Sequence, residues 1–225
     1  MSSHVTRWDM FWLWVRYWLI WPGMRQLGEP AQARLLVVQA FGRRNMPDND
    51  LGTLADRLRY HHHDDRAMLQ ELRKSTSWFQ PGPQNEQLAR ILWWFWEHYP
   101  TPCVVQWEVA AALSEAQLDS IGSHMHIVWP RRVGSNMYLT SRDILQEAKE
   151  LNASGHGRVM ILAHQQMVVR VMLLWNRLAG ERALAAPSHI DGFDPLSTQI
   201  WTRSPLQWLW RESRTRVHHA LHRWV

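Results

Sequence analysis

Five short apolar runs recur along the chain, and polar or helical stretches separate them. Runs rich in Val, Ile and Leu without polar alternation are typical of strands buried on both faces of a sheet. Strands that alternate with helices pair in parallel through right-handed crossovers, so the pattern predicts an α/β fold. The strands are expected at residues 34–40, 102–106, 124–129, 158–163 and 182–187.

Helices are expected between these strands, where apolar residues recur at spacings of three and four. One helix is expected to open at Asn85, another to span 109–113, and a third to end near Gly180. Ser141 is expected to cap a further helix, with Asp143 in its first turn, because both side chains favour the exposed N–H groups there. Together these elements predict a Rossmann-like open parallel sheet of about five strands flanked by helices, with extra N-terminal and C-terminal helices.

The chain divides into three predicted parts. Residues 1–30 form a Trp-rich amphipathic helix, residues 31–216 form the Rossmann-like domain, and residues 204–225 form an overlapping basic C-terminal helix. Within the domain, residues 43–84 are long for a strand-to-helix connection and predict insert helices or a lid.

The 16 tryptophans concentrate in three stretches, the first of which is residues 8–21. That stretch is too short to span a bilayer, carries Asp9 and Arg16, and lacks a small-residue cleavage site, so no secretory signal is expected. Two alternatives are open for this helix: packing against the domain's own flank, or contact with a membrane surface, where indole rings anchor. The expected location is cytoplasmic, with peripheral contact at the inner membrane under the second alternative.

The charge of the chain indicates the class of ligand, and its cysteine content indicates the cellular compartment. The chain has 25 basic and 20 acidic residues and a net charge of +5, and its basic residues are nearly all arginine. Arginine suits bidentate contacts to carboxylate or phosphate, so an anionic small molecule is the expected partner. The single cysteine, Cys103, excludes an intramolecular disulfide and a cysteine zinc site, and an inert core thiol in a reducing compartment is expected. No nucleic-acid-binding module occurs, so no nucleic-acid partner is expected, and the oligomeric state is left open.

Two histidine groups raise the question of a metal site. Residues 61–65 have the sequence HHHDD, and His218 and His222 are four residues apart near the C-terminus. Neither group has further ligands at a fixed spacing, so a solvated face is the preferred interpretation and no metal is expected.

Polar residues follow three of the predicted strands at the point where each strand ends. In an open parallel sheet, ligands bind in the crevice beyond the carboxyl ends of the strands. Side chains that are far apart in the sequence are therefore expected to reach one ligand there. The binding residues predicted at this edge are Gln39, Gly42, Asn85, Gln106, Ser141, Asp143 and Arg170.

His164 and Glu108 are the candidate catalytic residues. A neutral His164 at a helix start would accept a proton or orient a ligand hydroxyl, and the alternative is a histidine that hydrogen-bonds a loop carbonyl. Glu108 would bind a sugar hydroxyl or act as a base, or would simply occupy a first helical turn. Arg170 would clamp an acidic ligand or pair with Asp143 or Glu108. Whether the protein is an enzyme is left open; an enzyme of this kind would carry out group transfer or hydrolysis.

Six segments occur in order along the chain: FG, NEQLARIL, PTPCVVQWEVAAAL, TSRDILQEAKEL, GRVMILAHQQMVVRVMLL and DPLSTQIWTRS. In this order they resemble the YdcF/SanA-like family, over roughly residues 34–216. The resemblance implies a Rossmann-like domain with a role at the bacterial cell envelope. The cofactor is left unknown, with a nucleotide-like ligand such as S-adenosylmethionine as one candidate.

The resemblance also suggests roles for particular positions. The family's threonine–acid pair resembles Ser141 and Asp143, its histidine after the fourth strand resembles His164, and the arginine beyond it resembles Arg170. Its terminal motif resembles Asp194, Gln199, Trp201, Thr202 and Arg203, and this resemblance implies that Gln199 and Arg203 also bind the ligand. Of the family's glycine-rich turn only Gly42 is present, which weakens the case for tight backbone contact with a phosphate. Met167 stands where a second histidine is common, which weakens the case for two-histidine chemistry.

Two functions are therefore expected from the sequence. The first is a small-ligand-binding protein that acts on or senses an anionic or nucleotide-like molecule in envelope metabolism. The alternative is a membrane-associated, non-catalytic envelope or regulatory factor that works through its Trp-rich helix and its arginine-rich tail.

Overall fold

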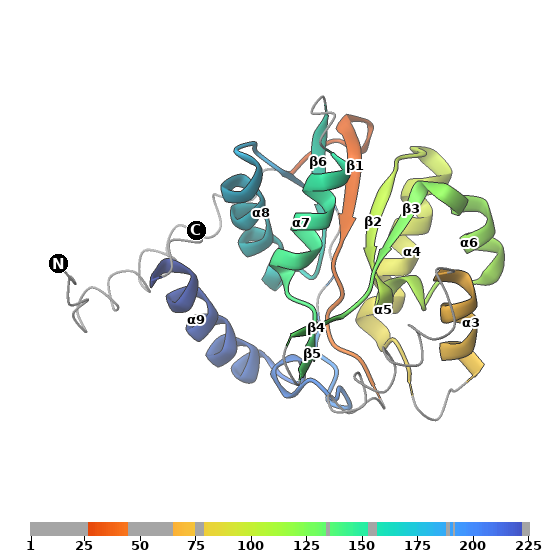
Figure 1. Ribbon diagram of the computed structural model, residues 1–225. Coiled ribbons are helices and arrows are strands. Elements are labelled where there is room, and N and C mark those ends of the chain that lie inside the picture. The colour runs from red at the N-terminus through yellow and green to blue at the C-terminus, as the bar shows by residue number, and fades with distance from the viewer. Residues whose placement is uncertain are drawn as a thin grey trace.

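The computed structural model describes residues 27–44, 65–74, 79–133, 136–152, 157–187, 190 and 192–221. In this part of the chain, five parallel strands form one sheet that helices cover on both faces (Figure 1). The strands are β1 (Ala33–Val38), β2 (Cys103–Gln106), β3 (Met125–Val128), β6 (Arg158–Leu162) and β7 (Leu184–Ala185). Each lies where an apolar run predicted a strand, so the expected α/β, Rossmann-like fold is confirmed.

β1 is the central strand of the sheet, whose order is β3-β2-β1-β6-β7. Val38 pairs with Val105 of β2 on one side and with Leu162 of β6 on the other. The chain therefore builds outward from β1 through β2 and β3, and later returns to the other side of β1 for β6 and β7. The boundary between β1 and β6 is where the strand order reverses, which is the usual place for a ligand crevice in an open α/β sheet.

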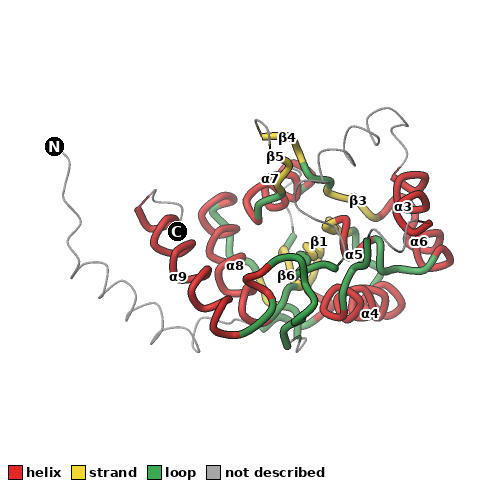
Figure 2. Tube along the Cα trace, turned by 90° about the horizontal axis from the view of Figure 1, so that it is seen from below, coloured by secondary structure: helices red, strands yellow, loops and turns green. Residues whose placement is uncertain are grey.

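The side chains of β1 alternate between two hydrophobic cores. Leu36 and Val38 belong to the core on one face, and Leu35 and Val37 belong to the core on the other. All four are buried, as expected for a parallel sheet covered on both faces. Figure 2 shows α4 and α7 on opposite sides of β1 and β6.

Helices complete each core. Those of the first core are α3 (Asp65–Lys74), α4 (Pro83–His98), α5 (Trp107–Ala110) and α6 (Glu115–Ile121). Those of the second core are α7 (Ser141–Leu151), α8 (Gln165–Ala179) and α9 (Pro205–Leu221). Short 3-10 turns also occur in the described residues, namely η2 (Pro30–Gln32), η3 (Gly122–His124) and η4 (Ile200–Thr202).

Two predicted helix starts are wrong. α4 begins at Pro83 rather than at Asn85, because proline's fixed φ and missing N–H suit the first helical position. The helix expected over 109–113 is α5, which begins at Trp107 directly after β2. Glu108 therefore lies in a first helical turn, which is the alternative that the sequence left open for it.

The N-cap of α7 is Thr140 and not Ser141. Thr140 Oγ1 accepts the Asp143 N–H at 3.2 Å, and the Asp143 carboxylate accepts the Thr140 N–H at 2.8 Å. This reciprocal pair is a capping box. It commits Asp143 to the structure of the helix and leaves Ser141 as the first helical residue.

Two elements of the structure, α6 and a short hairpin, were not expected from the sequence. Ser114 Oγ caps α6 by accepting the Gln117 N–H at 3.2 Å, and a serine followed three residues later by glutamine is a capping-box signature. β4 (Arg131–Val133) and β5 (Asn136–Tyr138) pair in antiparallel fashion. The two residues between them are Gly and Ser, a composition typical of a tight hairpin turn.

α3 lies within residues 43–84, where insert helices or a lid were expected, and it buries Leu69 and Leu72 in the first core. α9 lies within the stretch expected to form the C-terminal helix. The Trp-rich stretch, residues 8–21, lies outside the described residues. Of the helices that the structure describes, none has both the length and the apolar content needed to cross a membrane.

Candidate ligand-binding site

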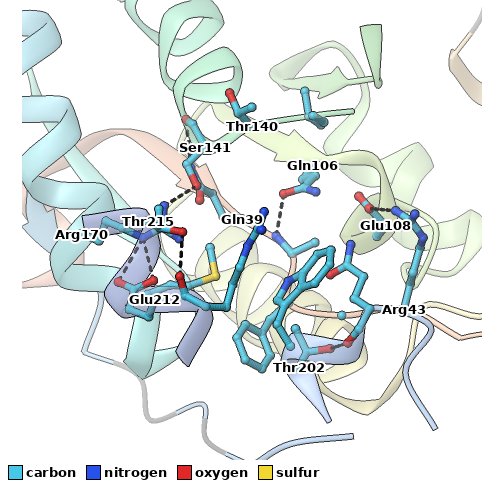
Figure 3. Close-up of a pocket in the computed structure, with 18 of the residues that line it drawn as sticks. Gln39, Arg43, Gln106, Glu108, Thr140, Ser141, Arg170, Thr202, Glu212 and Thr215 are labelled. Atoms are coloured by element: carbon cyan, nitrogen blue, oxygen red, sulfur yellow. Dashed lines mark hydrogen bonds and ion pairs between the residues drawn. The ribbon is translucent and has the colours of Figure 1, made fainter. Parts of the chain in front are cut away.

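A cavity of about 540 Å³ lies at the carboxyl edge of the sheet. Its volume is in the range of small-molecule sites, about 300–1,000 Å³. Three segments from the ends of strands and the start of a helix line the cavity. They are residues 39–43 after β1, residues 106–108 at the end of β2, and residues 139–142 at the start of α7. Side chains of α8 and α9 add to the wall, and Figure 3 shows the labelled residues arranged around the central space.

Two side chains that were predicted to bind ligand hold the turn after β1. Gln106 Oε1 accepts the Ala40 N–H at 3.0 Å. Asn85 is fully buried; its Oδ1 accepts the Phe41 N–H at 2.8 Å, and its Nδ2 donates to the Gly42 carbonyl at 2.6 Å. Gln106 also lines the cavity, whereas Asn85 lies behind the turn and positions its backbone.

Gly42 lies where this turn meets the segment that precedes α9. Its φ of 78° is in the left-handed region, which favours glycine. A Cβ at this position would lie 2.8 Å from Thr202 Oγ1 and 3.1 Å from Ser197 Oγ. Ser197 Oγ also accepts the Arg43 N–H at 3.3 Å, and this hydrogen bond holds Ser197 against the turn.

Gly42→Ala is expected to lower the free energy of unfolding by about 2–3 kcal/mol, because the methyl group adds an overpacked contact to the cost of a left-handed alanine. Gly180→Ala is the matched control, since Gly180 has a φ of 73° and no atom within 4 Å of a built Cβ. It should cost only about 1 kcal/mol, the backbone part alone. Urea unfolding of both variants checks this, and equal losses would contradict the steric argument.

Glu108 forms a buried ion pair with Arg43 at the cavity wall, with Oε1 3.4 Å from Nη1. The side chains of Arg43 and Glu108 are 5% and 3% exposed. Burial raises the pKa of the Glu108 carboxyl, while Arg43 and Gln106 act in the opposite direction. Glu108 therefore lines the cavity as a carboxyl that is already paired within the protein.

Arg170 pairs with neither Asp143 nor Glu108, the two partners considered from the sequence. Its Nε lies 3.2 and 3.1 Å from the two carboxylate oxygens of Glu212 on α9. Its Nη1 donates to Ser141 Oγ at 3.4 Å. Arg170 thus links α8 to α7 and α9, on the side of the cavity opposite the first ion pair (Figure 3).

His164 lies outside the cavity lining. Its fully buried ring stacks on Phe41, with the two ring centroids 3.8 Å apart. Nε2 donates to the Gly192 carbonyl at 2.8 Å, and Nδ1 accepts the Gln166 N–H at 3.3 Å. This geometry corresponds to the alternative in which the histidine hydrogen-bonds a loop carbonyl, and it occupies both ring nitrogens within the protein.

Polar contacts connect the segment before α9 to the turn that follows β1. Asp194 is buried and accepts two hydrogen bonds from the Arg44 guanidinium, at 2.7 and 2.9 Å. Arg203 is exposed and donates from Nε to the Ser197 carbonyl at 2.6 Å, outside the cavity. Gln199, from the same segment, lines the cavity.

The predicted site residues thus fall into two groups. At the cavity lie Gln39, Gly42, Gln106, Glu108, Ser141, Arg170 and Gln199. Within the structure around it lie Asn85, Asp143, His164 and Arg203. Proximity to the end of a strand was the common signal for most of them, but the direction of each side chain depended on hydrogen bonds that the sequence does not specify.

The cavity wall is rich in arginine. Of the described residues that line it, five are arginines and two are glutamates: Arg43, Arg142, Arg170, Arg211 and Arg214, with Glu108 and Glu212. The contribution of α9 was not expected from the sequence, because nothing local indicates that the tail folds over the carboxyl edge. The one available signal is the spacing of Arg211 and Arg214, which places both on one helix face.

Neither a reactive thiol nor a metal cluster adds to this site in the described residues. Cys103 is buried in the first core, and burial raises the pKa of its thiol to about 12, as expected for an inert thiol. No three His, Cys, Asp or Glu side chains gather as a metal site in the part of the chain that the structure describes. Residues 61–64 and the side chains of His218 and His222 lie outside that part.

Comparison of the chain with protein-family models, with curated proteins and with solved structures gives no match in any of the three. The resemblance to the YdcF/SanA-like family therefore stays a prediction.

Proposed function

We propose that the protein binds a small anionic molecule, phosphate-bearing or nucleotide-like, in the cavity at the carboxyl edge of its sheet. The observation that carries this proposal is the arginine-rich wall of a cavity placed where the strand order reverses. Ligands of open α/β sheets bind at that point. Guanidinium groups match the geometry of phosphates and carboxylates, so the wall favours an anion.

The charge distribution around the cavity supports the same conclusion. Glu108 is paired with Arg43 and Glu212 with Arg170, so each carboxylate neutralises an arginine on its own side of the cavity. The wall also carries Arg211 and Arg214, which form no ion pair with a carboxylate among the described residues and add positive charge at the cavity. An anion that enters this space is therefore attracted without displacing a buried carboxylate.

Aromatic side chains of the lining favour a ligand with a planar or apolar part. They are Phe41, Trp107, Trp201 and Trp208. Phe41, Trp107 and Trp208 are buried and Trp201 is partly exposed, so a planar part of a ligand would contact mainly the Trp201 ring. A nucleotide combines a planar base with a phosphate and so fits both features of the wall.

The proposal is tested by calorimetric titration of the full chain with pyrophosphate, ribose 5-phosphate and adenosine monophosphate. Ribose and adenosine serve as neutral controls. At least one phosphate-bearing probe is expected to bind saturably, and its neutral counterpart should bind at least tenfold more weakly. Absence of saturable binding by all three anions would refute the proposal.

Ser141→Phe places a bulky ring at the cavity wall and is expected to abolish that binding. Ser123→Phe is the matched control, because Ser123 is exposed in η3 and does not line the cavity. Equal binding by both variants would show that the anion occupies another part of the protein. A catalytic role for Glu108 and a place in envelope metabolism stay predictions.

A further inference from the structure

Four backbone N–H groups in the turn after β1 already donate hydrogen bonds within the protein. In dinucleotide-binding Rossmann folds, backbone N–H groups of this turn and of the following helix hold the phosphates. Here the N–H groups of residues 40, 41, 43 and 44 donate to Gln106, Asn85, Ser197 and Gln80. The atoms of Thr202 and Ser197 also close the space beside Gly42, where a Cβ would meet them at 2.8 and 3.1 Å. A phosphate cannot use those four N–H groups without breaking the hydrogen bonds that they already donate.

α9 offers an alternative set of phosphate ligands. Arg211 and Arg214 are three residues apart, so they share one face of the helix, and both line the cavity. Among the described residues, neither forms an ion pair with a carboxylate. The Arg211 guanidinium lies 4.9 Å from the ring centroid of Trp201, which also lines the cavity, and this contact orients it.

The helix that carries these arginines is fixed against the domain. Glu212 is buried and paired with Arg170 of α8. Trp208 is buried, and its ring centroid lies 5.0 Å from that of Phe41 in the turn after β1. A rigid support of this kind places Arg211 and Arg214 at a set position relative to the carboxyl edge of the sheet.

We infer that the phosphate group of the ligand is bound by Arg211 and Arg214 of α9, and not by the glycine turn after β1. This inference rests on the proposed function and assigns its anion-binding group to the C-terminal helix. Like charges three residues apart destabilise a helix slightly, and a phosphate between the two guanidinium groups removes that repulsion. The ligand class is a phosphate or diphosphate ester, whose oxygens accept bidentate hydrogen bonds from arginine.

The test is calorimetric titration of the full chain with pyrophosphate. Arg211→Ala and Arg214→Ala are each expected to weaken binding about tenfold, and the double variant about 100-fold. Arg211→Lys/Arg214→Lys, which keeps the charge and loses the guanidinium fork, should fall between the wild type and the double alanine variant. Hydrogen exchange on the wild-type protein should show that pyrophosphate slows exchange in α9.

Arg90→Ala/Arg177→Ala is the matched control, because both arginines are exposed on helices that turn them away from the cavity lining. It removes the same charge and should leave binding within about twofold. Unchanged binding in the Arg211/Arg214 double variant, or an equal loss in the control, overturns the inference while leaving the proposed function intact. Failure of the wild-type protein to bind any phosphate-bearing probe overturns the proposed function itself.

Discussion

Glu108→Ala is expected to lower the free energy of unfolding by about 3–5 kcal/mol, because it removes the carboxylate of a buried ion pair with Arg43. Both side chains are at most 5% exposed, so the guanidinium that loses this partner stays largely shielded from solvent in the folded state. The effect should be much larger than that of removing an exposed carboxylate, which typically changes stability by less than about 0.5 kcal/mol. Urea unfolding of the variant measures it.

The double variant Arg43→Met/Glu108→Leu tests whether the loss of stability comes from leaving one buried charge behind or from losing buried volume. It removes both charges and keeps the volume of the side chains, so its stability should lie within about 1 kcal/mol of the wild type. If the loss of unfolding free energy in the double variant equals the sum of the losses in Arg43→Met and Glu108→Leu, a direct interaction between the two residues is contradicted.

The pH dependence gives a second measure of the same carboxyl. Burial raises the pKa of Glu108, so the folded protein holds this proton more tightly than the unfolded chain does. Its contribution to stability is complete below the unfolded pKa, about 4.3, and is lost as the pH rises through the raised folded value. Glu108→Gln removes the titration. The unfolding free energy of the wild type relative to this variant should therefore fall with rising pH across that window.

Glu212→Ala is the second substitution with a large expected effect, a loss of about 3–5 kcal/mol of unfolding free energy. The Glu212 side chain is 2% exposed and accepts from Arg170, which is 12% exposed. Without this pair, α9 loses its charged anchor to α8, and the wall of the cavity loses its support. Chemical unfolding measures the stability, and faster hydrogen exchange confined at first to α9 should show where the structure loosens.

Glu97→Ala is the control, because Glu97 is exposed near the end of α4, far from α9 in the sequence. It should change the unfolding free energy by less than about 0.5 kcal/mol. A comparably small effect of Glu212→Ala would mean that α9 is held mainly by Trp208 and its neighbours. Arg170→Met should then be equally mild.

The sheet could be predicted from the sequence because strands that are buried on both faces consist almost wholly of apolar residues. β1 and β6 are apolar apart from one exposed arginine each, Arg34 and Arg158, and each strand of the sheet was found at its expected place. Helix boundaries were less predictable, because neighbouring residues compete for the same role. Thr140 and Ser141 are both good caps, and only the reciprocal hydrogen bond with Asp143 selects Thr140.

The candidate site was predictable only in part. The ends of parallel strands must meet at one edge, so Gln39, Gln106 and Glu108 were expected near each other, and all three line the cavity. His164 also follows a strand, yet its ring turns toward Phe41 and the Gly192 carbonyl. The direction of a side chain depends on which partners packing brings within reach, and those partners are far away in the sequence.

The sequence by itself determined the class of the fold, the place of its strands and the edge at which polar residues gather, because these follow from local hydrophobicity and from the pairing rules of parallel strands. Only the tertiary structure decided that α9 folds over that edge and adds Arg211, Arg214 and Glu212 to the cavity. The docking of a terminal helix depends on a few contacts between distant residues, here Arg170 with Glu212 and Phe41 with Trp208. Such contacts leave no periodic pattern in the chain.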